Sequence, residues 1–251
     1  MYSLKAKLAD PKRIINIQVN VIPSPVATQA IAAAGADAVI IDMEHGAIGH
    51  AEAHAMITAT QGFDCAPLVR VAEVNATQAK RVLDLGAEGV VFPLIRTADD
   101  ARDAVEFTSY PPSGTRGWGP FIAHSRWDVG LMDYQNKLGT GTVVCLLLET
   151  PEAVENIDAI CAVAGVDLMV VAQFDLSTTM GISGQFDHPD YLAAEKRLET
   201  AAFKAGMPLI GIANNATRAD ALFARGYRGI GGFDILSLKA AVATSAAWCK
   251  K

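Results

Sequence analysis

A glycine followed within a few residues by an apolar run recurs along this chain, and this repeat limits the folds that the chain can adopt. The four clearest copies read AAGADAVIID, LDLGAEGVVFP, AVAGVDLMVVA and ARGYRGIGGF. Glycine accepts the left-handed conformation that closes a helix, and an unbroken apolar run is typical of a strand buried on both faces. Each copy therefore predicts the end of a helix and the start of a buried strand.

Predicted strands and helices alternate eight times along the sequence. The strands are expected near residues 14–19, 38–42, 66–71, 89–93, 142–148, 167–171, 208–212 and 228–232. The helices are expected near residues 24–34, 49–61, 75–85, 97–107, 151–162, 190–205, 215–225 and 235–248. Such alternation implies parallel strands joined by helical crossovers. Eight units in 251 residues favour a closed (β/α)8 TIM barrel, an α/β fold, over an open sheet.

The rest of the chain gives no sign of a second domain. No GxGxxG follows an early strand and no Walker A sequence appears, so neither nucleotide-binding motif is present. The main irregular stretch, at about 108–141, is rich in Gly, Pro and aromatic residues and too apolar for a solvated linker. Long loops of this kind are usually functional or contact a partner. We therefore expect one domain over residues 1–251 that carries a long loop.

Composition restricts the partners and the compartment. A formal net charge of −6 and an isoelectric point near 5.3 argue against nucleic acid, which requires a basic surface. No apolar run approaches the length of a membrane span, and the first residues lack the apolar stretch of a signal peptide. The 4 cysteines form no CxxC pair, which makes disulfides and zinc unexpected. We expect a soluble cytoplasmic protein that binds neither membranes nor nucleic acid.

Polar side chains stand where several of the predicted strands end. The set comprises Asp42, Glu44 and His45 after the second strand, Arg70 in the third, Glu149 after the fifth and Asp175 near the end of the sixth. In a barrel the C-terminal ends of the strands meet at one mouth, where barrel enzymes build their active sites. The sequence therefore predicts a site of carboxylates, a guanidinium and an imidazole.

Each of these residues also has a purely structural interpretation. Asp175 could be a helix N-cap, and Glu149 could help to start the helix that TPEAVENI predicts. Arg70 could belong to a structural ion pair, and a lone histidine is more often a satisfied polar residue than a base. Convergence at one mouth favours the functional interpretation. Glu44 is the exception, because we expect it to face away in a structural salt bridge or hydrogen bond.

Two carboxylates on adjacent strands are the ligands that a hard divalent cation prefers, so Glu149 and Asp175 are candidate metal ligands. A bound Mg²⁺, Mn²⁺ or Co²⁺ could chelate a 2-oxo acid and stabilise the enolate formed when a proton leaves C3 or a carbon–carbon bond breaks. Arg70 would place a positive charge beside the developing oxyanion, and His45 could move the proton. The lysines fall on predicted helices or loops, which disfavours a Schiff-base aldolase.

The motifs that carry these residues resemble those of a known family, the HpcH/HpaI class II pyruvate aldolases of the phosphoenolpyruvate/pyruvate barrel superfamily. The resemblance runs from about residue 24 to the end and rests on IIDMEHG, LVRV, KRVLDLGAEGVVFP, YPPSGTRGWG, LLLETPEAVENIDAI and GVDLMVVAQFDLSTTMG. It implies that Glu149 and Asp175 are the metal ligands and that Arg70 holds the substrate ketone oxygen. By the same resemblance His45 transfers protons with Asp42 oriented near it, and Asp84 matches an acidic residue of the family site.

Two positions depart from the family pattern. Leu147 stands where members often have Gln, which removes a hydrogen-bonding group from the floor of the substrate pocket. Ala172, Gln173 and Phe174 replace part of a Gly-Pro-x-Asp-Leu stretch. Backbone amides near Phe174 and Asp175 could still bind a substrate carboxylate if a helix starts there, and Gln173 could partly replace the lost amide.

The resemblance also implies a homo-oligomer, a hexamer arranged as a trimer of dimers, with the C-terminal helix exchanged between subunits. Arg116 and the segment from Gly117 to Arg126 resemble a segment that reaches towards a neighbouring subunit. Arg116, His124 and Arg126 could there meet an acidic tail of the acceptor aldehyde. They could equally seal the subunit interface.

The leading hypothesis is a divalent-metal aldolase, a carbon–carbon lyase that reversibly joins an aldehyde and pyruvate or a related 2-oxo acid. Other enolate reactions, oxaloacetate decarboxylation or a citrate-type condensation, would use the same residues. A metal-binding barrel without catalysis is a third hypothesis, and retention of the whole residue set disfavours it. A CoA-ester lyase is disfavoured because the sequence shows no obvious basic cluster for nucleotide phosphates. The aldehyde, the metal, and the choice between pyruvate and hydroxypyruvate stay open.

Overall fold

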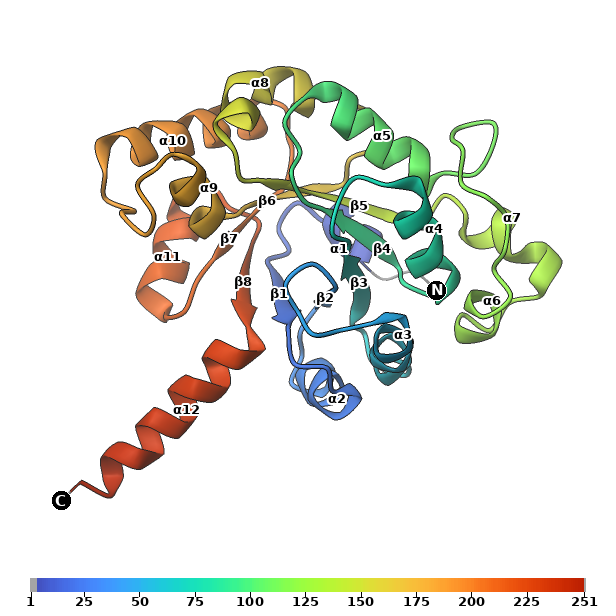
Figure 1. Cartoon of the computed structure of the whole chain (residues 1–251), viewed down its shortest axis with the longest axis horizontal. Coiled ribbons are helices and arrows are strands. Elements are labelled where there is room, and N and C mark those ends of the chain that lie inside the picture. The colour runs from blue at the N-terminus through green and yellow to red at the C-terminus, as the bar shows by residue number, and fades with distance from the viewer. Residues whose placement is uncertain (1–3, 251) are drawn as a thin grey trace.

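The computed structural model describes residues 4–250 and places them in one closed barrel of parallel strands with helices outside it (Figure 1). The strands are β1 (Ile15–Asn20), β2 (Ala38–Asp42), β3 (Ala66–Arg70), β4 (Gly89–Phe92), β5 (Val143–Leu148), β6 (Leu168–Val171), β7 (Leu209–Ile212) and β8 (Gly229–Phe233). Each strand pairs with the next along the chain, and β8 pairs with β1 to close the barrel. The predicted (β/α)8 fold is confirmed.

The helices that connect the strands begin and end within two residues of the predicted positions. They are α2 (Pro25–Ala33), α3 (His50–Ala59), α4 (Ala76–Asp84), α5 (Ala98–Thr108), α8 (Pro151–Cys161), α10 (Pro189–Lys204), α11 (Ala216–Arg225) and α12 (Asp234–Trp248). The sequence analysis did not predict α1 (Leu4–Ala9), whereas α9 (Gln173–Thr179) is the helix whose start it considered near Phe174 and Asp175. Helix α9 follows β6 directly, so the chain carrying Asp175 is helical rather than a loop.

The glycine pattern has the predicted backbone conformation. Gly35, Gly86, Gly165 and Gly226 have φ angles of 97°, 103°, 98° and 102°, in the left-handed region. Three of them stand just after the helices α2, α4 and α11, and each precedes a buried strand. A residue with a Cβ would be strained at these angles, so glycine marks the point where helix gives way to strand.

The barrel has a hydrophobic core on each side of its wall. One set of side chains fills the interior, among them Ile17, Ile40, Leu68, Val91 and Leu147. The alternate residues of the same strands pack outward against the helices and form the larger core. Because both faces are buried, the strands carry continuous apolar runs instead of alternating polar and apolar residues.

The long segment between β4 and β5 is more ordered than a loop. It contains two short helices, α6 (Ala123–Arg126) and α7 (Tyr134–Leu138), with the 3-10 turn η1 (Leu131–Asp133) between them. Its buried side chains form a separate small cluster: Tyr110, Ala123, Trp127, Tyr134 and Leu138. The apolar composition of this segment therefore builds a core of its own on the side of the barrel.

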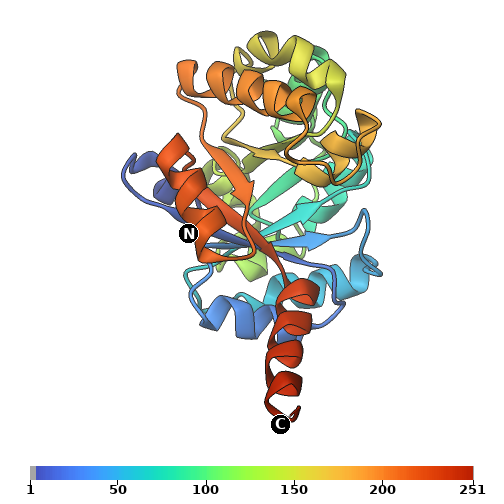
Figure 2. The ribbon, with the colours of Figure 1, turned by 90° about the vertical axis from the view of Figure 1, so that its left-hand side faces the viewer.

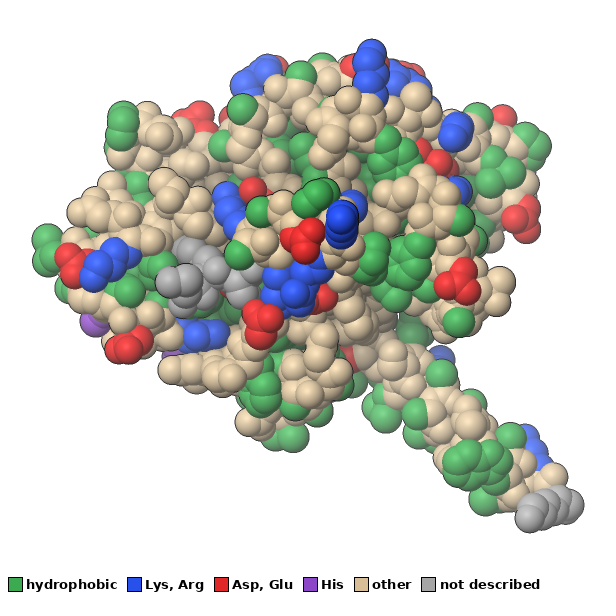
Figure 3. All heavy atoms as spheres, turned by 180° about the vertical axis from the view of Figure 1, so that it is seen from behind, with side chains coloured by type: hydrophobic (Ala, Val, Ile, Leu, Met, Phe, Trp, Pro, Cys, Tyr) green, Lys and Arg blue, Asp and Glu red, His purple; other side chains and the backbone are tan. Residues whose placement is uncertain are grey.

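Helix α12 leaves the barrel instead of packing on it. It extends away from the end of β8, with the C-terminus at its far tip (Figures 1 and 2). Residues 235–250 are all exposed. Hydrophobic side chains lie along its length (Figure 3), and these include Leu236, Leu238, Val242 and Trp248, which is 69% exposed. In a closed barrel this helix would cover the outside of β8 and β1, so its apolar side chains have no partner among residues 4–250.

The cysteines behave as packed or isolated thiols. All four, Cys65, Cys145, Cys161 and Cys249, are free. Cys145 is fully buried in β5, and burial raises the pKa of its thiol. Over residues 4–250 the structure has no helix that combines the length and the hydrophobicity needed to span a bilayer.

Candidate active site

The C-terminal ends of neighbouring strands bring the predicted polar residues to one end of the barrel. Asp42 is the last residue of β2 and Arg70 is the last residue of β3, and the two are partners in the parallel ladder. Glu149 follows β5 directly, and Asp175 lies in the first turn of α9, just beyond β6. The predicted convergence follows from the order of the strands in the barrel.

Arg70 is held rigidly by two carboxylates. Its Nε donates to Asp42 Oδ1 at 2.9 Å and its Nη2 donates to Asp42 Oδ2 at 2.5 Å, a bidentate pair. Its Nη1 lies 3.2 Å from Glu44 Oε2. Burial alone would raise the pKa of Asp42, but the hydrogen bonds and the positive charge of Arg70 outweigh that effect and lower it. The guanidinium therefore stays charged and fixed at the mouth.

The expectation that Glu44 faces away from the site is wrong. Its side chain is largely buried and lies between Arg70 and His45, with Glu44 Oε2 3.7 Å from His45 Nε2. Burial raises the pKa of Glu44 although the charges of Arg70 and His45 oppose this rise. The expected salt bridge exists, but it is part of the site, because the turn after β2 folds back over the end of β3.

His45 and Asp42 are both at the mouth but are related differently than predicted. Asp42 Oδ1 accepts hydrogen bonds from the backbone N–H groups of Glu44 at 3.0 Å and His45 at 3.2 Å. Asp42 thus shapes the turn and anchors Arg70, and it orients the backbone of His45 instead of the imidazole. The imidazole is 61% exposed at the rim of the barrel, where it can exchange protons with solvent.

Glu149 and Asp175 are carboxylates close enough for the charge of Asp175 to act on Glu149. Glu149 is buried, with its Oε1 accepting a hydrogen bond from the backbone N–H of Leu94. Thr179 Oγ1 links α9 to the end of β5, because it lies within 3.0 Å of the backbone carbonyls of Glu149 and Asp175. The pKa of Glu149 is raised to about 7, mainly by burial. The charges of Asp175 and Glu44 contribute to this rise, whereas the hydrogen bond from Leu94 and the charge of Arg70 oppose it.

This pair has the donor chemistry that a divalent cation requires. A buried carboxylate whose charge is disfavoured by burial and by a second carboxylate is stabilised when a cation binds between them. Within residues 4–250 no cluster of three or more His, Cys, Asp or Glu side chains forms a complete metal site. Glu149 and Asp175 are therefore a partial set, and water or substrate oxygens would complete it, as is usual for Mg²⁺.

An apolar cavity lies directly inside the mouth. It has a volume of about 50 Å³, and the polar side chains on its wall are those of Arg70 and Asp175. Leu147 and Phe174 line it as well, so four of the five predicted substrate-binding residues border this space. Gln173 does not line the cavity. Its Oε1 accepts a hydrogen bond at 3.3 Å from Arg218 on α11.

Asp84 is not at the mouth of its own barrel. It is the last residue of α4, the helix that returns the chain to the N-terminal end of β4, so it lies near the opposite end of the barrel. Asp84 Oδ1 accepts from Nη2 of Arg116 at 3.0 Å. This position separates Asp84 from Arg70, Glu149 and Asp175 and places it beside the 117–126 segment. Its role in the family site stays a prediction.

The three basic residues of that segment are held by their own chain. Arg116 has a fully buried side chain, and its Cζ lies 4.5 Å from the centre of the Tyr110 ring. Its contact with an acceptor aldehyde stays a prediction. Arg126 donates to Thr60 Oγ1 at 2.8 Å, and Nδ1 of His124 lies 3.1 Å from the Val129 carbonyl. These contacts hold the three side chains within their own subunit, and the sealing of a subunit interface stays a prediction.

Two residues of the site were missed by the sequence analysis. The backbone of Leu94, which has a positive φ of 56°, donates the hydrogen bond to Glu149. Arg218 links Gln173 to Glu195, with its Nη2 3.3 Å from each side-chain oxygen. The apolar run before Leu94 gives no signal for the backbone bond. Arg218 follows the C-terminal end of the predicted seventh strand by a few residues. That position was the signal that could have placed it near the mouth of the barrel.

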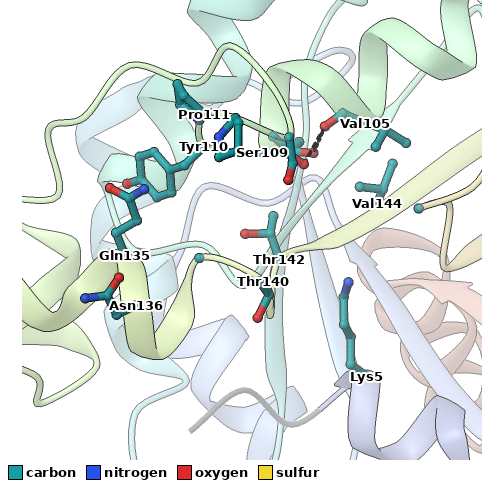
Figure 4. Close-up of a pocket in the computed structure, with 15 residues that line it drawn as sticks. Lys5, Val105, Ser109, Tyr110, Pro111, Gln135, Asn136, Thr140, Thr142 and Val144 are labelled. Atoms are coloured by element: carbon teal, nitrogen blue, oxygen red, sulfur yellow. Dashed lines mark hydrogen bonds between the residues drawn. The ribbon is translucent and has the colours of Figure 1, made fainter.

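A larger cavity lies elsewhere among the described residues. It has a volume of about 460 Å³ and lies between α5, α7 and the start of β5 (Figure 4). Tyr110, Gln135 and Thr142 line it, and Ser109 Oγ donates to the Val105 carbonyl at its edge. It lies at the N-terminal end of β5, whereas Glu149 follows the C-terminal end, so it is separate from the candidate site.

Fold and site together define a barrel enzyme with a guanidinium and paired carboxylates at the C-terminal strand ends. The family model for HpcH/HpaI aldolase/citrate lyase matches residues 23–241, and the chain belongs to that family. It is similar to 4-hydroxy-4-methyl-2-oxoglutarate aldolase of Chaetomium globosum, with 37% identity over 204 residues covering 78% of this chain and 75% of that protein.

Two further comparisons agree with this assignment. The chain is 35% identical to 4-hydroxy-2-oxo-heptane-1,7-dioate aldolase of Salmonella dublin over 190 residues, which cover 75% of this chain and 72% of that protein. The crystal structure of an HpcH/HpaI aldolase/citrate lyase family protein from Burkholderia cenocepacia superposes with a TM-score of 0.91, at 29% identity and full coverage of both chains. The predicted family is confirmed, and so is the prediction of an enzyme of the aldolase class.

Proposed function

We propose that this protein reversibly cleaves a 4-hydroxy-2-oxo acid to a pyruvate-like 2-oxo acid and an aldehyde or ketone, with a divalent metal ion held by Glu149 and Asp175. The observation that carries the proposal is the fixed Arg70 guanidinium at the same strand ends as this carboxylate pair. The two named relatives are aldolases of 4-hydroxy-2-oxo dicarboxylates, which supports this substrate class for the present chain.

The reaction needs two kinds of assistance from the site. When bound, the metal ion would polarise the C2 ketone of the substrate and so stabilise the negative charge that develops as the C3–C4 bond breaks. Arg70 contributes a second positive charge that its two carboxylate partners keep in place. In the cleavage direction the C4 hydroxyl loses its proton, the C3–C4 electron pair moves onto the 2-oxo acid, and C3 later gains a proton.

We assign the proton transfers to His45. Its imidazole stands at the open rim and near Glu44, so it can take a proton from the substrate side and exchange it with solvent. Asp42 is a positioning residue, since it fixes the turn that carries His45 and the guanidinium of Arg70. We propose Mg²⁺, Mn²⁺ or Co²⁺ as the metal, because oxygen ligands accept all three.

We also propose that the protein is a homo-oligomer, a hexamer built as a trimer of dimers. Two features support this proposal: α12 extends away with exposed Leu236, Val242 and Trp248, and no helix of the described part of the chain covers the outer side of β1 and β8. Exchange of α12 between two subunits would bury its apolar side chains and would cover the outer side of β1 and β8 in the partner. Asp84 and the 117–126 segment would then be available to a neighbouring subunit.

The cytoplasm is the compartment that we propose. The free cysteines, none of them placed in a disulfide, suit a reducing environment. Small-molecule substrates are the proposed partners, and the formal net charge of −6 makes nucleic acid an unsuitable one.

Proton exchange at C3 of pyruvate in D₂O tests the proposal without knowledge of the acceptor. The protein is stripped of metal with a chelator, and exchange is followed by NMR before and after Mg²⁺ or Mn²⁺ is added. We expect exchange only with metal. Metal binding without any exchange of pyruvate or 2-oxobutanoate would reject enolate chemistry at this site.

A further inference from the structure

The interior of the barrel just below Arg70 and Asp175 offers almost no hydrogen-bonding groups. Nine of the eleven residues that line the 50 Å³ cavity are apolar. The floor is formed by inward-facing side chains of the strands, among them Ile40, Leu147, Val170 and Ile212. Leu147 is buried and lies on β5 two residues before Glu149, so its side chain is the part of the floor next to the carboxylate pair.

The two polar side chains on the wall leave one side of the cavity polar and the rest apolar. Arg70 uses Nε and Nη2 on Asp42 and directs Nη1 to Glu44. Asp175 lies on the opposite strand end, in α9. A 2-oxo acid bound with its oxygens at this polar edge would direct the substituent on C3 to the apolar floor.

We propose that this cavity receives the C3 substituent of the donor, so that the protein takes 2-oxo acids with hydrogen or a short alkyl group at C3 and discriminates against a C3 hydroxyl. Leu147 is the specificity residue. This inference rests on the proposed function for the identity of the donor class. It selects pyruvate and 2-oxobutanoate over hydroxypyruvate, a choice that the sequence leaves open.

The size of the cavity sets the length of the alkyl group. A water-sized group requires about 10–15 Å³ of such volume, so about 50 Å³ accommodates a methyl or ethyl group but not an aromatic ring. Burying one additional methyl group favours binding by about fourfold. A hydroxyl buried without a partner weakens binding by a factor of about 5 to 150.

Donor binding tests the inference independently of turnover. Dissociation constants of the Mg²⁺-loaded protein for pyruvate, 2-oxobutanoate and hydroxypyruvate are measured by titration calorimetry. We expect 2-oxobutanoate to bind at least as tightly as pyruvate, and hydroxypyruvate to bind at least about fivefold more weakly than 2-oxobutanoate. Hydroxypyruvate bound as tightly as 2-oxobutanoate by the unmodified protein would overturn the inference.

Two substitutions of Leu147 test whether its side chain causes the donor preference. Leu147→Gln adds a donor and an acceptor at nearly the same volume, and it should tighten hydroxypyruvate relative to 2-oxobutanoate by about fivefold or more. Leu147→Met is the matched control, because it keeps the volume and apolar character and should keep the original preference. Equal shifts in both variants, or a shift in neither, would exclude Leu147 as the specificity residue.

The calorimetric experiment tests the donor preference and the exchange experiment tests the aldolase reaction, so either hypothesis can be rejected without the other. Loss of C3 exchange with the donor preference intact would reject the aldolase reaction and keep the apolar donor site. Metal-dependent exchange with no preference between the two substituted donors would keep the aldolase reaction and reject the inference. The unmodified protein gives both readings, so neither depends on the folding of a variant.

Discussion

Asp42 and Arg70 stand opposite each other at the last rung of the β2–β3 ladder and are joined by two hydrogen bonds of 2.9 and 2.5 Å. Both side chains are nearly or fully removed from solvent. A buried pair of this kind fixes the direction of the guanidinium, and the charge of Arg70 is then available to substrate without a cost of reorganisation.

Removing the charge of Asp42 should destabilise the protein. Asp42→Asn leaves Arg70 with one carboxylate neighbour in a buried site, and loss of one partner of a buried pair typically costs about 3–5 kcal/mol of unfolding free energy. Urea denaturation measures this change. Asp99→Asn is the control, because its ion pair with Arg102 is exposed and should contribute far less. Equal effects of the two substitutions would show that the Asp42–Arg70 pair has no special role.

The metal-free protein should become less stable as pH rises from about 4.5 to 7. Burial raises the pKa of Glu149 to about 7 from 4.5, so the folded state holds this proton more tightly than the unfolded state does. The free energy of unfolding then falls across this window, by about 3 kcal/mol for a shift of this size. Chemical denaturation of Glu149→Gln over the same pH range should lack this fall. Parallel curves for the two proteins would show that Glu149 does not titrate in this window.

Loss of either carboxylate should abolish metal-dependent chemistry while the fold persists. Glu149→Ala or Asp175→Ala removes one of the two proposed protein ligands, so C3 exchange of pyruvate should disappear and metal affinity should fall. NMR exchange and metal titration measure the two effects, and circular dichroism checks the fold. Glu155→Ala on the exposed side of α8 should behave like the unmodified protein. Full exchange in the Asp175 variant would exclude it as a ligand.

His45→Ala should slow proton exchange and leave metal affinity nearly unchanged. General acid–base groups contribute typically about 10²–10⁴-fold, and the imidazole is at the rim instead of between the carboxylates. Exchange rates and metal titration on the same preparation separate the two quantities. A large loss of metal binding would mean that His45 is a ligand and that its assignment to proton transfer is mistaken.

Charges placed on the exposed face of α12 should reduce the size of the assembly. The double substitution Val242→Asp and Trp248→Asp removes two exposed apolar groups, and exposed positions have little effect on the stability of a single barrel. Light scattering after size-exclusion chromatography measures the mass. Lys239→Glu changes the charge of the same helix without removing apolar area, and it should leave the mass unchanged. An unaltered mass in the double variant would exclude α12 as an interface.

Most residues at the mouth of the barrel could be predicted from the sequence, because their positions depend only on local sequence signals and on the order of the strands. Glycines that need a left-handed backbone and unbroken apolar runs determine where helices end and strands begin, and eight alternations close the barrel. In parallel strands every C-terminal end points the same way, so Arg70, Glu149 and Asp175 converge whatever the details of packing. These residues were predictable for that reason.

The tertiary structure alone decided how side chains in turns and loops are directed. Glu44 contacts Arg70 because the turn after β2 folds back onto it, and Asp84 lies at the other end of the barrel because it ends a helix there. Arg116 forms an ion pair with Asp84 and packs on the ring of Tyr110. Helix α12 extends away from the barrel, although its apolar side chains would allow it to cover the strands. Residue type and periodicity determine which elements form, since these are properties of neighbours along the chain. The direction of a turn and the partner of a charge depend on contacts between distant segments, which exist only once the barrel has closed.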